Sequence, residues 1–333
     1  MDITLPDTLR IGNGKIQFNI TDPYTNIFQI NNTDYIPYYL DNNNPGNKGG
    51  NSHILKLVNA QEFDEDEGYP EIPDLILKIS KIWIDKYSEK PKSLRFKREI
   101  DALIDCNENN LSNVVTVENS GKASILNDLG FRKNHRYYTM PYAMNDLPSF
   151  LADNNISLID RVGLCLEICE SLKQIWTKGY YHRDIKPDNI LFIDGYWVIS
   201  DLGLNKNRNE DVRLDLDKLG QWIGPRGWMS PEAMNKFLSE KFPWKSIHDC
   251  NIDHQSDLYQ LGKVFWYIFQ GNSPEGGIRR SDFLWKNEAL YQIIRTMINN
   301  SKNRRYNEIT NVIIDFKRVY SKLENNVLEE SLY

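Results

Sequence analysis

Side chains able to carry out one kind of chemistry gather in a short stretch, His-Arg-Asp-Ile-Lys-Pro-Asp-Asn at residues 182–189, and in Asp201 shortly after it. Moving a terminal phosphoryl group requires a carboxylate that accepts the hydroxyl proton, oxygen ligands for Mg²⁺ and a cation beside the transferred oxygens. Asp184 supplies the proton acceptor and Lys186 the cation. Asn189 and Asp201 supply the metal ligands. The spacing therefore predicts a phosphoryl-transfer site, because a merely polar loop would carry these identities only by accident.

The stretch 182–189 resembles the catalytic loop of eukaryotic-type protein kinases, whose pattern His-Arg-Asp-x-Lys-x-x-Asn it meets at every fixed position. Asp201-Leu202-Gly203 resembles the metal-binding motif of that family, with Leu202 as a conservative apolar replacement for the usual Phe. The resemblance extends from about residue 36 to residue 323. It implies an α+β, bilobal protein kinase-like fold with a small β-rich N-lobe and a mainly helical C-lobe.

The resemblance also implies a role for each side chain. Asp184 would orient and deprotonate the acceptor hydroxyl, and Lys186 would stabilise the transferred charge. Asn189 and Asp201 would hold Mg²⁺, for which Mn²⁺ could substitute.

Lys78 and Glu99 are expected to form an ion pair that completes the phosphate-binding machinery. Lys78 lies in a strand-like run where the family has a lysine that binds the α- and β-phosphates, and Glu99 lies in a later helical pattern. The pair would hold the ammonium in one place, since a lysine is otherwise a flexible point charge. Two ordinary surface charges are the alternative interpretation of either residue alone.

The phosphate-covering loop departs from the family pattern Gly-x-Gly-x-x-Gly. The best alignment is Asn-Lys-Gly-Gly-Asn-Ser-His-Ile at residues 47–54, which keeps only the middle glycine. Asn accepts left-handed backbone and Ser is small, so backbone amides could still approach phosphate oxygens, although a plain surface turn is the alternative. The alignment assigns these residues to nucleotide binding: Asn47, Gly49, Gly50, Ser52 and Ile54.

Residues 138–143, Tyr-Thr-Met-Pro-Tyr-Ala, resemble the family's hinge, whose backbone groups pair with adenine between the lobes. Met140 would guard the back pocket. Pro141 has a carbonyl but no N–H, whereas Ala143 would offer both backbone groups. ATP is the expected phosphoryl donor, and GTP is the alternative.

Hydrophobic patterning changes near residues 143–146. Strand-like runs precede this point at 36–40, 54–58, 75–79 and 137–143, with one helical pattern at 93–104. Helical patterns follow it at 158–180, 255–270, 283–299 and 306–323. Residues 9–20 alternate around Asn13-Gly14, which predicts a β-hairpin. The expected domains are an N-terminal extension at 1–35, an N-lobe at 36–143 and a C-lobe at 144–333.

Composition argues against several classes of protein. The net charge of −6 disfavours a dedicated nucleic-acid surface. The longest apolar run, around 264–269, is far too short to span a bilayer, and the N-terminus has no signal-peptide pattern. The few scattered cysteines do not form a disulfide framework. We therefore expect a soluble cytoplasmic protein with no membrane or nucleic-acid partner.

We call residues 224–232 the docking segment. Their sequence is Gly-Pro-Arg-Gly-Trp-Met-Ser-Pro-Glu. The end of this segment resembles the family's Ala-Pro-Glu motif, and Arg304 is expected to pair with Glu232. Residues 256–262 resemble the helix that carries a structural aspartate, here Asp257. Small-molecule kinases of this fold usually lack such a platform, so a protein substrate is favoured.

Two signals conflict over the acceptor hydroxyl. Lys186 is the serine/threonine-type feature, because its ammonium can bridge the transferred phosphate and the acceptor oxygen. Pro225-x-x-Trp228-Met229 instead resembles tyrosine kinases. Serine and threonine are favoured, with tyrosine or dual specificity as alternatives.

The activation loop, residues 204–229, contains no Ser, Thr or Tyr. In kinases with an arginine before the catalytic aspartate, here Arg183, a phosphorylated loop residue commonly neutralises that arginine. The loop carries acidic residues that could take this place: Glu210, Asp211, Asp215 and Asp217. Activity without loop phosphorylation is therefore predicted. A solvated acidic loop that contacts nothing is the alternative.

Two other functions stay open at this point. A pseudokinase that serves as a nucleotide-binding scaffold would account for the irregular glycine loop, but the intact catalytic and metal-binding residues argue against it. A small-molecule phosphotransferase is the other alternative.

Overall fold

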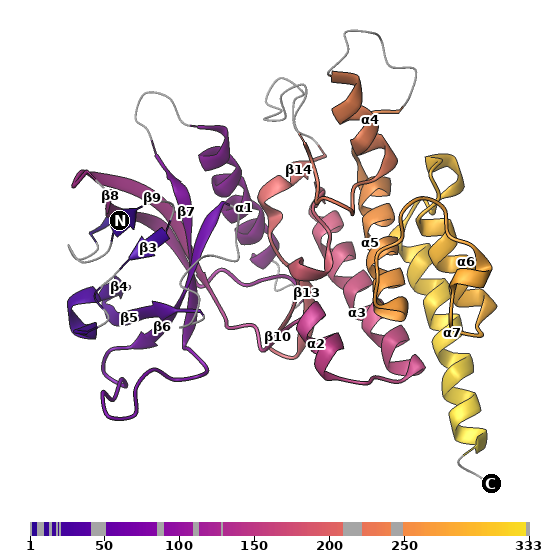
Figure 1. Cartoon of the computed structure of the whole chain (residues 1–333), viewed down its shortest axis with the longest axis horizontal. Coiled ribbons are helices and arrows are strands. Elements are labelled where there is room, and N and C mark those ends of the chain that lie inside the picture. Colours follow the sequence, from indigo (N-terminus) through magenta and orange to yellow (C-terminus); the bar gives the residue numbers. More distant parts are fainter. Residues whose placement is uncertain are drawn as a thin grey trace. The chain divides into compact units, whose positions relative to one another are not determined.

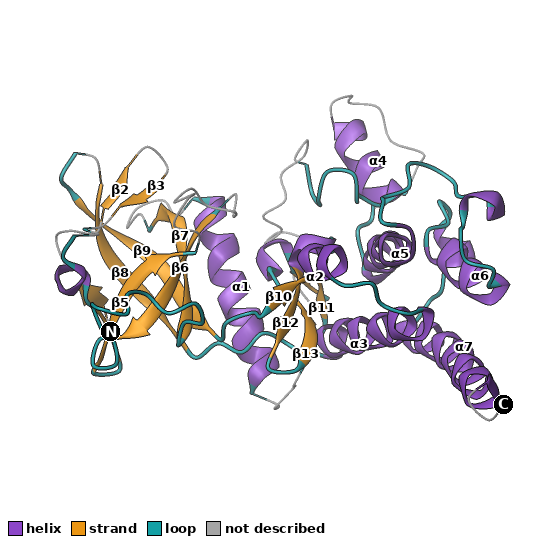
Figure 2. Ribbon diagram, turned by 60° about the horizontal axis from the view of Figure 1, so that its bottom comes forward, coloured by secondary structure: helices purple, strands orange, loops and turns teal. Residues whose placement is uncertain are grey.

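The computed structural model describes residues 2–4, 10–12, 15–17, 19, 21–40, 51–84, 90–108, 113–127, 129–208, 222–240 and 249–330. The chain divides into two compact units, Met1–Asn107 with Val115–Tyr142 and Glu108–Val114 with Ala143–Tyr333. The first unit is built mainly of strands and the second mainly of helices (Figures 1 and 2). The predicted α+β class is therefore confirmed.

The first unit contains a single sheet in the described part of the chain. Its strands are β1 (Asp2–Thr4), β2 (Arg10–Gly12), β3 (Lys15–Gln17), β4 (Phe28–Ile30), β5 (Thr33–Tyr39), β6 (Ser52–Asn59), β7 (Leu75–Trp83), β8 (Asn119–Asn127) and β9 (Arg132–Met140). Their order is β3-β2-β8-β9-β7-β6-β5-β4, and β1 also pairs with β8. The strand-like runs predicted at 54–58 and 75–79 fall in β6 and β7. Those predicted at 36–40 and 137–143 extend past the ends of β5 and β9, at Tyr39 and Met140.

The N-terminal strands join this sheet. β2 and β3 form the expected antiparallel hairpin, although its Asn13-Gly14 turn lies outside the described residues. Both β1 and β2 run parallel to β8. An isolated hairpin is marginally stable in water. Here Ile16 of β3 is 2% exposed and belongs to the sheet's core, so residues assigned to an extension contribute to the first unit.

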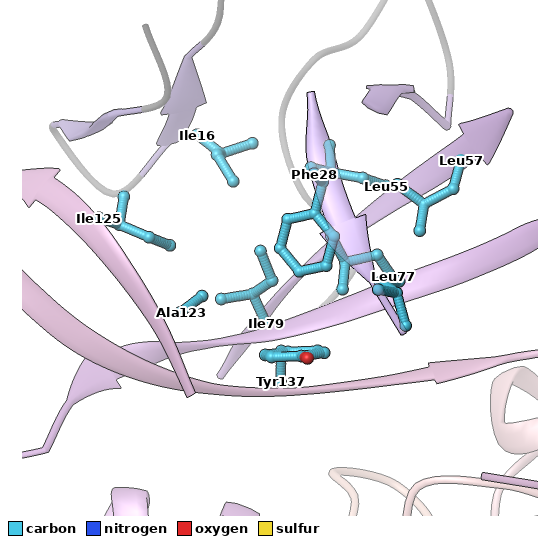
Figure 3. Close-up of a cluster of buried hydrophobic side chains, with 10 residues drawn as sticks. Ile16, Phe28, Leu55, Leu57, Leu77, Ile79, Ala123, Ile125 and Tyr137 are labelled. Carbon is cyan, nitrogen blue, oxygen red and sulfur yellow. The ribbon is translucent and has the colours of Figure 1, made fainter. Parts of the chain in front are cut away.

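The core of the first unit follows from the two-residue period of its strands, which sends alternate side chains to the same face. Figure 3 shows these side chains converging: Ile16, Phe28, Leu55, Leu57, Leu77, Ile79, Ala123, Ile125 and Tyr137. The rings of Phe28 and Tyr137 meet edge to face at a centroid distance of 5.2 Å. The predicted helix at 93–104 lies within α1 (Pro91–Asn107), which packs on β7 and β9.

The second unit is mainly helical. Its helices are α2 (Leu147–Asp153), α3 (Leu158–Thr177), α4 (Pro231–Glu240), α5 (His254–Gln270), α6 (Glu288–Met297) and α7 (Ile309–Glu330). Short strands accompany them: β10 (Asn145–Asp146), β11 (Tyr180–Tyr181), β12 (Ile190–Ile193), β13 (Tyr196–Ile199) and β14 (Lys206–Asn207). None of the helices in the described ranges has both the length and the apolar character needed to cross a membrane.

Local signals set the ends of the helices. α3 begins at a capping box formed by Ser157 and Asp160, and it ends just before Gly179, whose φ of +83° stops a helix. α5 begins at a second capping box, between Asp253 and Ser256. The predicted helix at 283–299 begins later, at Glu288, because Asn287 caps it by accepting from the backbone N–H of Leu290.

Candidate active site

In the first unit, Lys78 on β7 and Glu99 on α1 form the expected ion pair. Lys78 Nζ lies 2.7 Å from Glu99 Oε1, and these residues are 8% and 2% exposed. Tyr138 on β9 donates a hydrogen bond from its hydroxyl to the same carboxylate oxygen, at 2.9 Å. Lys78 Nζ also lies 5.6 Å from the centre of the Tyr138 ring. The ammonium is therefore fixed by a carboxylate and an aromatic face together.

Tyr138 was not among the predicted site residues. Its role follows from strand register, because Tyr138 stands directly opposite Lys78 in the β7–β9 pair. Register of this kind cannot be derived from strand-like patterns alone.

We expect Tyr138→Phe to lower the free energy of unfolding by about 1.5–3 kcal/mol, the range for a hydrogen bond to a charged group. We also expect weaker nucleotide binding, because one contact that orients Glu99 is lost. Urea unfolding and a nucleotide titration measure the two effects. Tyr196→Phe, at a tyrosine that is 44% exposed, is the matched control. Identical behaviour of the two variants would contradict the role assigned to Tyr138.

The structure describes only some of the other residues of the first unit that were predicted to bind nucleotide. Asn47, Gly49 and Gly50 lie outside the described residues. Ser52 opens β6 and is buried, and Ile54 stands opposite Lys78 in the β6–β7 pair.

The hinge-like residues 138–143 span the end of β9, the last strand of the first unit. Met140 ends β9 and is 8% exposed. Pro141 comes directly after it, and Ala143 is the first residue of the second unit's main segment.

In the second unit, a hairpin brings the predicted metal ligands to one end. β12 and β13 are antiparallel, with Ile190 opposite Ile199. Asn189 directly precedes the hairpin, and Asp201 follows it after one residue. The backbone N–H of Ser200 donates to the Asn189 carbonyl at 2.7 Å, which closes this end. The local sequence thus brings Asn189 and Asp201 to the same end of the hairpin.

Asn189 also contacts the predicted proton acceptor. Its Nδ2 donates to the backbone carbonyl of Asp184 at 2.8 Å and to Oδ2 of the Asp184 carboxylate at 3.2 Å. These bonds direct the amide oxygen of Asn189 away from Asp184. That oxygen and the Asp201 carboxylate are hard donors suited to Mg²⁺, which usually takes few protein ligands and keeps waters and phosphate oxygens. The donor set therefore fits the expected metal.

Two residues in this part of the second unit adopt backbone conformations that are uncommon for residues with a side chain. Arg183, next to Asp184, has a φ of +70°, and Asp201 has a φ of +64°. Such conformations persist only where surrounding contacts determine them.

Asp257 on α5 provides contacts of this kind. It is fully buried and accepts hydrogen bonds from the backbone N–H groups of His182 and Arg183, both at 2.8 Å, and from Nε1 of Trp176 at 3.0 Å. Burial raises the pKa of Asp257 to about 6, while the three N–H donors favour its ionised form. Asp257, predicted to be a structural aspartate, therefore holds the backbone just before Asp184.

His182 links the backbone at Asp184 to the backbone at Ser200, next to Asp201. Its Nδ1 accepts from the backbone N–H of Asp184 at 3.2 Å, so its Nε2 carries the proton and donates to the carbonyl of Ser200 at 3.0 Å. Burial lowers the pKa of His182 to about 4, which keeps the ring neutral. Lys186, two residues beyond Asp184, is partly exposed.

Glu232 at the end of the docking segment pairs with Arg305, so the prediction of Arg304 is wrong. Arg305 donates from both terminal nitrogens to the two carboxylate oxygens, at 2.8 and 3.0 Å, and it is 5% exposed. Arg304 ends a short 3₁₀ turn and is exposed. Two adjacent arginines look alike in sequence, and only the direction of the backbone decides which of them is buried.

The acidic loop residues predicted to neutralise Arg183, namely Glu210, Asp211, Asp215 and Asp217, lie outside the described residues. Arg183 itself is buried, with 3% exposed.

Comparison with known proteins finds similarity to protein kinases. A family model described as the protein kinase domain matches residues 78–326. Serine/threonine-protein kinase 16 of Homo sapiens is 34% identical over 135 residues, which cover 39% of this chain and 40% of that protein. Serine/threonine-protein kinase KSP1 of Saccharomyces cerevisiae is 32% identical over 138 residues, covering 39% of this chain and 12% of that protein. Dual specificity protein kinase TTK of Mus musculus is 26% identical over 158 residues, covering 47% of this chain and 18% of that protein. The matched region is less than half the length of each of these relatives.

Proposed function

This chain belongs to the protein kinase family, and we propose that it transfers the γ-phosphoryl group of ATP to serine and threonine hydroxyls of protein substrates. The observation that supports this most directly is the contact between Asn189 and the carboxylate of Asp184, made where a hairpin also brings in Asp201. In this proposal Asn189, which contacts Asp184, and Asp201 flank the same hairpin.

Each side chain has a defined task in this proposal. Asp184 receives the proton of the acceptor hydroxyl, and Lys186 places its ammonium beside the charge that develops on the transferred oxygens. Asn189 and Asp201 hold Mg²⁺, or Mn²⁺ in its place. Lys78, fixed by Glu99 and Tyr138, binds the α- and β-phosphates. Mg·ATP supplies the phosphoryl group and neutralises its charge when bound.

The choice of serine and threonine rests on Lys186 and on relatives named as serine/threonine kinases. Incubation of the full chain with Mg²⁺ and radiolabelled ATP, followed by phosphoamino-acid analysis, tests it. Phosphoserine and phosphothreonine are expected in a mixed protein acceptor. Phosphotyrosine as the main product would overturn the acceptor class. Transfer to sugars or aminoglycosides but to no protein would overturn the protein substrate. No transfer to any acceptor would favour a scaffold.

Activity without phosphorylation of the activation loop is a further part of the proposal. Residues 204–229 offer no hydroxyl to a kinase, so we expect phosphatase treatment to leave the initial rate unchanged. The rate is measured after the phosphatase is removed, with mass spectrometry to verify complete dephosphorylation. A mock-treated sample is the control. Loss of activity on dephosphorylation would contradict this expectation.

We also propose a cytoplasmic setting. The sequence has only four scattered cysteines and no pattern of a disulfide framework, which suits a reducing compartment.

A further inference from the structure

Gln260 on α5 contacts the backbone on both sides of Asp184. Its Oε1 accepts from the backbone N–H of Ile185 at 3.0 Å, and its Nε2 donates to the carbonyl of Arg183 at 3.2 Å. The side chain is 2% exposed, so these bonds are made away from water. Two neighbouring peptide groups, those next to the proposed proton acceptor, are thus held by one amide.

Asp257 could not make these contacts in place of Gln260. The two residues are three positions apart on α5 and share a face. Asp257 is a carboxylate that only accepts, and it binds the N–H groups of His182 and Arg183. An amide can accept and donate at once, as the carbonyl of Arg183 and the N–H of Ile185 require.

The docking segment passes directly over this amide. A Cβ added at Gly224 would lie 3.3 Å from Nε2 of Gln260 and 3.4 Å from the Arg183 carbonyl oxygen. Gly224 has a φ of +110°, which favours glycine. One turn further along α5, Lys263 donates to the carbonyl of Gly227 at 2.5 Å. The docking segment and the catalytic loop therefore rest on one face of the same helix.

We propose that Gln260 is a positioning residue for phosphoryl transfer. Its amide fixes the peptide groups that flank Asp184, and the docking segment packs on the same amide at Gly224. One side chain thus sets the spacing between the proton acceptor and the bound substrate polypeptide. This inference rests on the proposed function.

Gln260→Glu tests the proposal with little change in volume. At about pH 8 the carboxylate keeps an acceptor for Ile185 but loses the donor to Arg183. We expect kcat to fall about tenfold with an unchanged KM for ATP, since one buried hydrogen bond is lost. As the pH falls, a buried carboxyl regains a proton, and the protonated form again offers one donor and one acceptor. The ratio of variant to wild-type kcat should therefore recover towards acid pH.

Gln260→Ala supplies a second readout that does not depend on activity. We expect faster hydrogen exchange at the amide of Ile185, and a loss of kcat that does not recover with pH. Gln292→Ala, at an exposed glutamine of α6, is the matched control and should match the wild type. A wild-type kcat in both Gln260 variants, or a kcat ratio for Gln260→Glu that does not change with pH, would overturn the inference. Transfer by the wild type that Asp184→Asn lowers by about a hundredfold or more tests the proposed function separately, whatever the Gln260 variants do.

Discussion

Asp184→Asn is expected to lower kcat for phosphoryl transfer by about 10²–10⁴-fold, the range for loss of a general acid–base group. Asparagine keeps the shape of the side chain, and its oxygen can still accept the bond that Asn189 donates to Asp184. Its amide cannot take up a proton at neutral pH. The chemical step is therefore lost while the contacts of the loop persist.

Initial rates with a protein acceptor and a thermal melt separate the two consequences of this change. We expect an unchanged melting temperature and an unchanged KM for ATP, because Asp184 is proposed to act on the acceptor hydroxyl. Asp188→Asn makes the same replacement four residues later in the same loop, at an exposed position, and should behave as wild type. If Asp184→Asn keeps a rate close to that of Asp188→Asn, another group accepts the proton.

The local geometry of the segment proposed as the catalytic loop could be predicted from sequence, because its residues are close together along the chain. Asp184 and Asn189 are five residues apart, and a short loop of that length can close only in a few ways. The hairpin that follows joins Asn189 to Asp201 by antiparallel pairing of neighbouring strands. Fixed spacing within one short segment therefore carries most of the geometry.

The contacts that hold this loop in place could not be predicted in the same way. Gln260 reaches Arg183 across 77 residues of sequence, and Tyr138 reaches Glu99 across 39. Helical periodicity indicates that Gln260 lies on a buried helix, and strand patterning indicates that Tyr138 lies in a sheet. Neither pattern shows which backbone group a polar side chain meets.

The pairing of the N-terminal strands was likewise beyond what the sequence could predict about the fold. Alternation around Asn13-Gly14 predicts a hairpin, because the signal lies within a few residues. The parallel pairing of β1 and β2 with β8 joins segments more than a hundred residues apart, as for Ile3 opposite Ala123. Alternation specifies a face for each strand but no partner, so the extension could not be assigned to the sheet beforehand.

Arg305→Met is expected to lower the free energy of unfolding by about 3–5 kcal/mol, the cost of leaving a buried charge without its partner. Glu232 is 2% exposed, and it has the guanidinium of Arg305 and the hydroxyl of Ser256 as hydrogen-bond donors. Methionine fills much of the volume of arginine but donates nothing. Arg304→Met is the matched control, at the exposed neighbour, and should stay within about 0.5 kcal/mol of wild type. Urea unfolding at neutral pH measures both.

The pH dependence of the stability loss in Arg305→Met identifies the cause of that loss. Burial opposes the charge of Glu232, but the hydrogen bonds and charge of Arg305, with the bond from Ser256, outweigh it and hold the pKa of Glu232 below its ordinary value. A carboxyl with a lowered folded pKa stabilises the fold above its unfolded pKa, and this contribution is lost as the pH falls through the folded value. In Arg305→Met, only the hydrogen bonds from Ser256 and from the backbone still oppose the effect of burial, so the pKa of Glu232 rises and protonation relieves the unpaired charge. The deficit of the variant should therefore shrink as the pH falls below the raised pKa. A deficit that is the same at neutral and acid pH would show that Arg305 contributes through packing and its hydrogen bonds to the backbone carbonyls of Gln255, Asn299 and Asn300, and not through the charge of Glu232.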